Sequence, residues 1–190
     1  KIQSSGLDGS DVLDLVVEGL KAPAGLALDA AGGYLYWCDN VVGRVQRSRT
    51  DGSDVMDLIV GLSYPHGLAL DIHRGIVYWT DAGSFKIQRM DLQEGASVED
   101  ISVGSVKDPY GVALDPATGF LYWSSVGTTY DRRKGTSEAS TNGRIQRSNL
   151  SQTNHSEDLV SIGRTKAFAL ALALPVNCGA DSGANTCMPF

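Results

Sequence analysis

Positive charge, proline and long apolar runs are all scarce in this sequence of 190 residues. The formal net charge of −6 argues against a nucleic-acid partner, because phosphate binding needs a basic face, and it gives no support for binding to a membrane surface. The longest apolar run, residues 167–176, is much shorter than a membrane span. Only 6 prolines beside 22 glycines favour many tight turns over disorder.

Cysteine is also rare, with three residues. Cys178 and Cys187 lie close together near the C-terminus, where we expect a small disulfide loop formed in an oxidising compartment rather than two free thiols. Cys38 stands where a repeated segment has Thr80, which favours a small, half-buried strand residue over a reactive thiol. The sequence begins at Lys1 without a signal peptide, as expected of a mature or truncated product.

Repetition, by contrast, dominates the sequence. Three segments align without gaps from Pro23, Pro65 and Pro109: PAGLALDAAGGYLYWCD, PHGLALDIHRGIVYWTD and PYGVALDPATGFLYWSS. Their starts are 42 and 44 residues apart, and in each segment the tryptophan follows the proline by 14 residues. A period of roughly 40 to 45 residues is typical of β-propeller blades, each a four-stranded sheet.

The rest of each period supplies two further strands. Segments that begin at Arg44, Lys86 and Arg144 repeat one alternating pattern, which KIQ at Lys1 also shows. After Arg44 the pair Asp51-Gly52 predicts a type I′ hairpin, in which both central residues need positive φ. Helical periodicity is absent, so the predicted fold class is all-β.

The predicted architecture is a β-propeller of four-stranded antiparallel blades, with about four blades' worth of sequence in this chain. We expect a partial blade at 1–20, blades at 21–62, 63–106 and 107–163, a closing strand at 167–174, and a Cys-containing tail at 175–190. The third complete blade carries an insertion at 125–143. Terminal strands that join in one blade would hide two sheet edges.

The repeated motifs resemble those of a known family. Tyr-Trp-Cys-Asp ending at Asp39, Tyr-Trp-Thr-Asp ending at Asp81 and Tyr-Trp-Ser-Ser ending at Ser125, each preceded by Gly-(Leu/Val)-Ala-Leu-Asp, resemble the YWTD repeats, the class B repeats of low-density lipoprotein receptors. The resemblance spans Lys1 to about Ala173. It implies an arc of a six-bladed propeller, although a smaller closed ring or pairing with another chain stays open. The tail is similar to the start of an epidermal-growth-factor-like module, which commonly follows such propellers.

The resemblance also assigns structural roles. Asp39 and Asp81 match the family's aspartate that hydrogen-bonds toward the neighbouring blade, and Ser125 departs from it. We expect the large aromatic residues to be scaffold, because burying a side chain of that size contributes roughly 2 to 3 kcal/mol. The structural motif residues are Tyr36, Trp37, Asp39, Tyr78, Trp79, Asp81, Tyr122 and Trp123.

Two sequence features are candidates for protein binding. The spacing from the motif tryptophan to the next strand's arginine is 10 residues in the first two copies and 24 in the third, so the third copy has a polar insertion. Such an insertion favours specialised contact, and a tolerated surface loop is the alternative. Corner residues beside the Pro-x-Gly segments share a face with it. The candidates are Tyr64, His66, Tyr110, Tyr130, Arg132, Arg133 and Lys134.

Two N-glycosylation sequons, at Asn149 and Asn154, lie in one predicted hairpin of the third blade. Together with the tail cysteines they favour a secreted glycoprotein. Glycans there would project from the face opposite the insertion and leave the insertion's face free.

Enzymatic functions receive little support. Asp29, Asp71 and Asp115 resemble a ring of metal ligands, but they occupy one repeat position, which favours a structural role in turns. His66 and His73 fall on different faces and are not expected to share a zinc ion. The sequence therefore predicts a non-enzymatic extracellular module that binds a protein ligand or a neighbouring subunit, with no cofactor or metal. The alternatives are a structural component of an extracellular matrix or cell-surface filament, and a metal-dependent propeller hydrolase.

Overall fold

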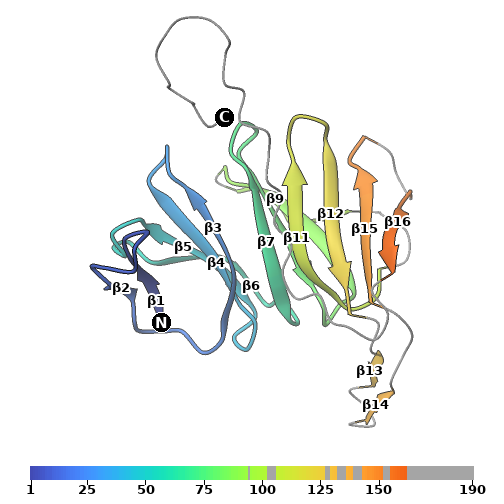
Figure 1. Ribbon diagram of the computed structural model, residues 1–190, viewed down its shortest axis with the longest axis horizontal. Helices are drawn as coiled ribbons and strands as arrows, with labels where there is room; N and C mark the ends of the chain where they lie inside the picture. The colour runs from blue at the N-terminus through green and yellow to red at the C-terminus, as the bar shows by residue number, and fades with distance from the viewer. Residues whose placement is uncertain are drawn as a thin grey trace, which may run out of the picture.

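The computed structural model describes residues 1–93, 95–101, 106–126, 129–131, 136–138, 143–151 and 155–161. In these residues the regular structure is entirely β-strand, which confirms the all-β prediction (Figure 1). Over the same part of the chain, no helix is long and apolar enough to cross a membrane.

The strands form antiparallel sheets that stand side by side like propeller blades (Figure 1). Blade 1 contains β3 (Pro23–Asp29), β4 (Tyr34–Asp39), β5 (Arg44–Arg49) and β6 (Met56–Val60); blade 2 contains β7 (Pro65–Asp71), β8 (Ile76–Asp81), β9 (Lys86–Asp91) and β10 (Glu99–Asp100); blade 3 contains β11 (Pro109–Asp115), β12 (Phe120–Ser125), β15 (Arg144–Asn149) and β16 (Glu157–Ser161). A half-blade precedes them, made of β1 (Ile2–Ser4) and β2 (Leu13–Val16), and β13 (Thr129–Asp131) pairs with β14 (Thr136–Glu138).

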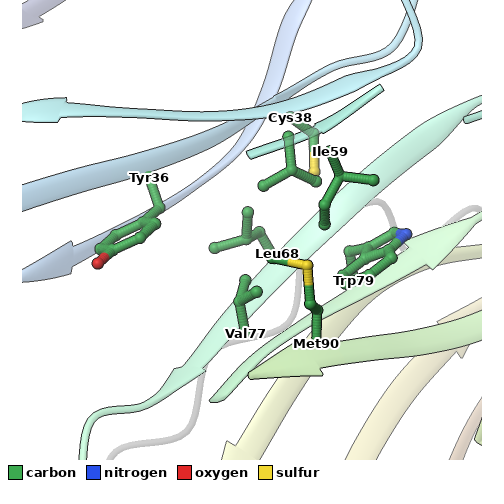
Figure 2. Close-up of a cluster of buried hydrophobic side chains, with 8 residues drawn as sticks. Tyr36, Cys38, Ile59, Leu68, Val77, Trp79 and Met90 are labelled. Carbon is green, nitrogen blue, oxygen red and sulfur yellow. The ribbon is translucent and has the colours of Figure 1, made fainter. Parts of the chain in front are cut away.

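Large apolar side chains fill the spaces between adjacent blades. Between blades 1 and 2, Tyr36 and Cys38 from one sheet face Leu68 and Trp79 from the other (Figure 2). Between blades 2 and 3, Tyr78 packs with Val112, Leu114 and Trp123, and the half-blade packs on Trp37. In the first two motifs, therefore, the tyrosine faces the following blade, and in all three motifs the tryptophan faces the preceding strands.

A hydrogen-bonded network of tryptophan, glutamine and aspartate recurs in every complete blade. In blade 1 the indole Nε1 of Trp37 donates to Oε1 of Gln46 at 3.1 Å, and Nε2 of Gln46 donates to Oδ1 of Asp57 at 2.7 Å. Arg44 donates to the same carboxylate. The equivalent sets are Trp79, Gln88, Asp100 and Lys86 in blade 2, and Trp123, Gln146, Asp158 and Arg144 in blade 3. The network satisfies the N–H of a fully buried indole, which otherwise would be costly to desolvate.

Two local predictions were wrong. Of the pair Asp51-Gly52, only Gly52 has positive φ (86°), and its N–H donates to the carbonyl of Arg49, so the turn is not type I′. Cys38 is completely rather than half buried. Burial and the nearby Asp81 raise the pKa of its thiol, which disfavours the reactive thiolate.

Candidate protein-binding face

One end of the sheets collects the linkers that enter each blade and the loops between the second and third strands. The innermost strand of each blade begins there with a proline that pairs with the last residue of the second strand: Pro23 with Asp39, Pro65 with Asp81 and Pro109 with Ser125. We call this end the corner face. The β13–β14 hairpin belongs to the same end and projects beyond blade 3 in Figure 1.

Buried carboxylates hold the first two corners in place. Asp81 accepts hydrogen bonds from the backbone amides of Ser63 (2.9 Å) and Tyr64 (2.9 Å) in the linker from blade 1. Amides of its own loop, at Gly83 and Ser84, donate to the same side chain. Both oxygens of the Asp81 carboxylate therefore hold the linker into blade 2.

Asp39 does the same for blade 1, with bonds from the amides of Lys21 (2.7 Å) and Ala22 (3.1 Å). Burial opposes ionisation of Asp39, but the hydrogen bonds from these amides outweigh it and hold the pKa of this carboxyl below its ordinary value. In blade 3 the corresponding Ser125 instead donates its hydroxyl to Gln146.

The glycines of the first two Pro-x-Gly corners permit close approach of adjacent innermost strands. A Cβ on Gly25 would lie 2.3 Å from the carbonyl oxygen of His66, and one on Gly67 would lie 2.2 Å from that of Tyr110. Thr80 bridges the same gap, since it accepts from the amide of Gly67 and donates to the carbonyl of Tyr110. The variable corner residues of neighbouring blades are therefore held close together.

This approach assembles an aromatic cluster from Tyr64, His66 and Tyr110, three of the predicted binding residues. The imidazole centroid lies 4.9 Å from the Tyr64 ring, edge to face, and 4.2 Å from the Tyr110 ring. All three side chains are half-buried, so each keeps some surface in contact with solvent. Blade 1 has only Ala22 and Ala24 at the equivalent positions, which confines the cluster to blades 2 and 3.

Among the described residues, three buried side-chain polar atoms have no hydrogen-bond partner, and all three lie on the corner face. They are Nε2 of His66, Oδ1 of Asn40 and Oγ of Ser84. Buried polar groups are nearly always hydrogen-bonded in folded proteins, so three unpaired atoms at one end of the sheets are unusual. Burial lowers the pKa of the His66 imidazole, and the nearby Asp81 carboxylate partly opposes that shift, so the ring is neutral at pH 7.

Phe85 is a further aromatic residue on this face that the sequence analysis missed. It is 47% exposed and adopts a φ of 59°, a left-handed conformation that is strained for a bulky residue. Blade 1 has Gly43 at this position with a φ of 71°. The available signal was the internal alignment, in which a phenylalanine stands where the neighbouring repeat has a glycine.

Other predicted site residues fall partly or wholly outside the described part of the structure. Tyr130 lies in β13, where its backbone pairs with Ser137. Arg132, Arg133 and Lys134 lie outside the described residues, as do Cys178, Cys187, Asn154 and residues 167–174. Tyr36, Trp37, Asp39, Tyr78, Trp79, Asp81 and Trp123 are buried in the sheets and at their corners, and Tyr122 is half-buried.

The opposite end of the sheets holds the carboxylates that resembled metal ligands. Each accepts hydrogen bonds from its own turn: Asp29 from Gly32, Asp71 from Arg74, and Asp115 from Ala117 and Thr118. The described residues contain no group of three or more His, Cys, Asp or Glu that is arranged to hold a metal ion. Asn149 ends β15 at this end, and its Oδ1 accepts from the amide (2.9 Å) and hydroxyl (2.6 Å) of Ser151.

Solved structures share this fold. A chain of the crystal structure of a nidogen/laminin complex superposes with a TM-score of 0.64 at 25% identity, over 80% of this chain and 52% of that chain. Hydrazine synthase of Kuenenia stuttgartiensis matches with a TM-score of 0.58 at 18% identity, over 78% of this chain and 39% of that one. Streptogramin B lyase matches with a TM-score of 0.54 at 15% identity, over 73% and 41%. The chain thus spans about half the length of the first of these. No family model matches it.

Proposed function

We propose that this chain, which resembles the YWTD repeat propellers in both repeat pattern and fold, is a non-catalytic extracellular module that binds a protein ligand or neighbouring subunit through its corner face. The observation that carries the proposal is the aromatic cluster of Tyr64, His66 and Tyr110 on a face that, among the described residues, also holds the three buried polar atoms without partners. Aromatic residues are enriched at protein interfaces, and a desolvated group contributes most when the partner satisfies it.

The rigidity of the scaffold supports the same function. The carboxylate of Asp81 fixes the backbone that carries Tyr64, and Thr80 fixes the backbone that carries Tyr110. Side chains held in place before binding lose less conformational entropy when a partner arrives. The strained backbone of Phe85 adds to this argument, because a cost in folding free energy is tolerated most often where function requires it.

The extracellular location rests on one structural likeness and on sequence features. The nidogen/laminin structure is a complex between proteins of that name, and its propeller-like chain is the likeness with the highest identity described above. The sequons at Asn149 and Asn154 and the proposed Cys178–Cys187 disulfide point to secretion. We propose that the glycans project from the end of the sheets opposite the corner face. We also propose that Arg132, Arg133 and Lys134, in the insertion, extend the corner face.

Catalysis is the less favoured function. The two enzymes among the similar structures are 18% and 15% identical to this chain, so they support the fold alone. Asp29, Asp71 and Asp115 each serve their own turn. A divalent cation bound with micromolar affinity in isothermal titration calorimetry would instead favour the metal-dependent hydrolase.

Surface plasmon resonance with laminin and other purified extracellular matrix proteins as probes tests the proposal. We expect His66→Ala and Tyr110→Ala each to weaken binding by about 30-fold or more, as expected of central interface aromatics. Tyr34→Ala is the matched control: its ring stacks with Arg47 and Arg49 at the opposite end of blade 1, and binding should not change. Equal loss in all three variants, each folded by circular dichroism, would contradict binding through the corner face.

A further inference from the structure

One arginine recurs on the third strand of every complete blade, and in two of the blades it is paired with a glutamate of the outer strand. In blade 2, Nε of Arg89 donates to Oε2 of Glu99 at 2.9 Å. In blade 3, Nε of Arg147 donates to Oε1 of Glu157 at 2.6 Å. Each arginine stands opposite its glutamate in the sheet register, so the two strands present the charges to each other. Such charge-assisted hydrogen bonds are about twice as strong as neutral ones.

Blade 1 has the arginine without the glutamate. Arg47 stands opposite Met56, and its Nε donates to the Met56 sulfur at 3.3 Å. A thioether is a weak acceptor and carries no charge. Across the described residues Arg47 forms no ion pair, whereas Arg89 and Arg147 each form one. Arg47 is half-buried, so its guanidinium has lost part of its hydration without gaining a carboxylate.

A second arginine adds to the charge of this site. Arg49 stands opposite Tyr34, and the guanidinium carbons of Arg47 and Arg49 lie 4.6 and 4.4 Å from the centroid of the Tyr34 ring. Cation–π contacts with one ring hold both guanidinium groups in place. Oδ2 of Asp54 lies 3.7 Å from Nε of Arg49, but the Asp54 side chain is 78% exposed and such pairs contribute little. The site is therefore positively charged in a chain of formal net charge −6.

The arginine patch, as we call this site, consists of Tyr34, Arg47, Arg49 and Met56. Strand pairing places the four side chains on one face of the blade 1 sheet, at the end opposite the corner face. Solvent reaches the patch, since Met56 is 45% exposed and Arg49 is also exposed. At the position of Arg49, blade 2 has Asp91 and blade 3 has Asn149. Of the three complete blades, only blade 1 therefore has two arginines here.

We propose that the arginine patch binds an acidic segment of a partner protein, whose carboxylate takes the place at Arg47 that glutamates take at the equivalent arginines of blades 2 and 3. The carboxylate accepts hydrogen bonds from the guanidinium, and the aliphatic part of the acidic side chain packs on Met56. The patch and the corner face lie at opposite ends of the sheets. The acidic partner is therefore different from the ligand of the corner face, and neither site depends on the other.

A sulfated or phosphorylated polymer is the competing partner. Such a polymer binds through many cationic contacts along a basic surface, and its affinity grows with their number. The patch has only two arginines, with Asp54 beside them. The groups that pair with the same arginine in blades 2 and 3 are carboxylates. Both observations favour an acidic protein segment.

Titration with hexaglutamate at low salt, followed by NMR of the arginine Nε–H groups, tests the proposal in the intact chain. We expect saturable shifts of the Arg47 and Arg49 signals with a Kd of about 1 mM or tighter. Arg89 and Arg147 are controls within the same molecule, because their glutamates already occupy the equivalent place. Their signals should stay constant, and hexaglutamine should shift none of the four. Equal shifts at all four arginines, or no shift at Arg47 up to about 10 mM hexaglutamate, would overturn the proposal.

Two charge-matched substitutions test the specific contact. Met56→Glu supplies within the chain the carboxylate that blades 2 and 3 have, so it should weaken hexaglutamate binding by about tenfold or more. Val55→Glu adds the same charge one residue before β6 and should weaken binding by about twofold or less. Equal weakening by both variants would show that net charge governs binding, and would overturn the proposal.

A second pair of variants covers the case in which Met56→Glu does not fold. Arg47→Gln should weaken the titration observed at Arg49 by about tenfold or more, and Arg147→Gln, which removes the same charge in blade 3, should leave it unchanged. Equal effects of these two variants would contradict the assignment. A heparin tetrasaccharide that binds the patch about tenfold more tightly than hexaglutamate would identify a sulfated polymer as the partner and overturn the proposal as well.

Discussion

Blades 1 and 2 share the same internal contacts but present different side chains on the corner face. Both have the Trp–Gln–Asp network, the same strand register and a buried aspartate that binds the incoming linker. On the corner face, however, blade 1 presents Ala22, Ala24 and Gly43, and blade 2 presents Tyr64, His66 and Phe85. Repeated residues thus maintain the blade, and unrepeated ones at matched positions distinguish its surface. A repeat protein provides its own control for every candidate site.

The largest effect tests the shared part of this comparison. Trp37→Ala and Trp79→Ala should each lower the free energy of unfolding by about 3–5 kcal/mol, because both side chains are fully buried and leave cavities. Urea denaturation measures both values. Costs that differ by more than the usual twofold scatter would show that the two blades are not equivalent scaffolds.

The corner aspartates give the next largest effect. Asp81→Ala should destabilise the fold by about 2–3 kcal/mol, because it leaves buried backbone amides of the linker and loop without acceptors. Ser125→Ala in blade 3 removes one hydroxyl bond and should cost about 1 kcal/mol or less. Chemical denaturation of the two variants compares them directly, and a cost at Ser125 equal to that at Asp81 would contradict the assignment.

Exchange of Gly43 and Phe85 tests the difference between the blades. Phe85→Gly should leave the free energy of unfolding constant or raise it by up to about 1 kcal/mol, since glycine adopts positive φ without strain. Gly43→Ala should cost about 2 kcal/mol, because a Cβ there would lie 2.2 Å from the carbonyl oxygen of Leu62. Thermal unfolding measures both. Destabilisation by Phe85→Gly would mean that the Phe85 side chain stabilises the fold by packing rather than serving as an exposed surface residue.

The smallest effect is a dependence on pH. Burial lowers the pKa of folded His66 below its usual value of 6.5, so the unfolded chain binds the proton more readily. The stability from this site is complete above pH 6.5 and declines as pH falls from 6.5 toward the folded pKa. The urea midpoint of wild type minus that of His66→Phe, followed from pH 8 to pH 5, measures this. A difference that grows on acidification would contradict the sign.

Asp39 titrates in a lower range. Its folded pKa is depressed, so its contribution is present above the unfolded pKa and is lost as pH falls through the folded value. Its titration therefore leaves the difference measured for His66 unaffected above pH 5.

Much of the fold was predictable because each repeat contains its own strands and turns. The proline that begins each innermost strand and the aspartate that ends the second strand were visible as sequence, and β3 and β7 begin at Pro23 and Pro65. The packing of His66 between Tyr64 and Tyr110 was not predictable, since it depends on the spacing of two blades. The exposure of Leu26, with the same local sequence as buried Leu68, depends on which strand stands in front of it.

The Trp–Gln–Asp network also has a spectroscopic consequence. Its three indole protons occupy near-identical buried sites, with donor–acceptor distances of 3.0 to 3.1 Å. Their resonances should therefore fall close together and exchange slowly with deuterium, one for each complete blade. As the sheets separate under mild denaturant, the order in which these three signals decay would report which blade opens first, without any added label.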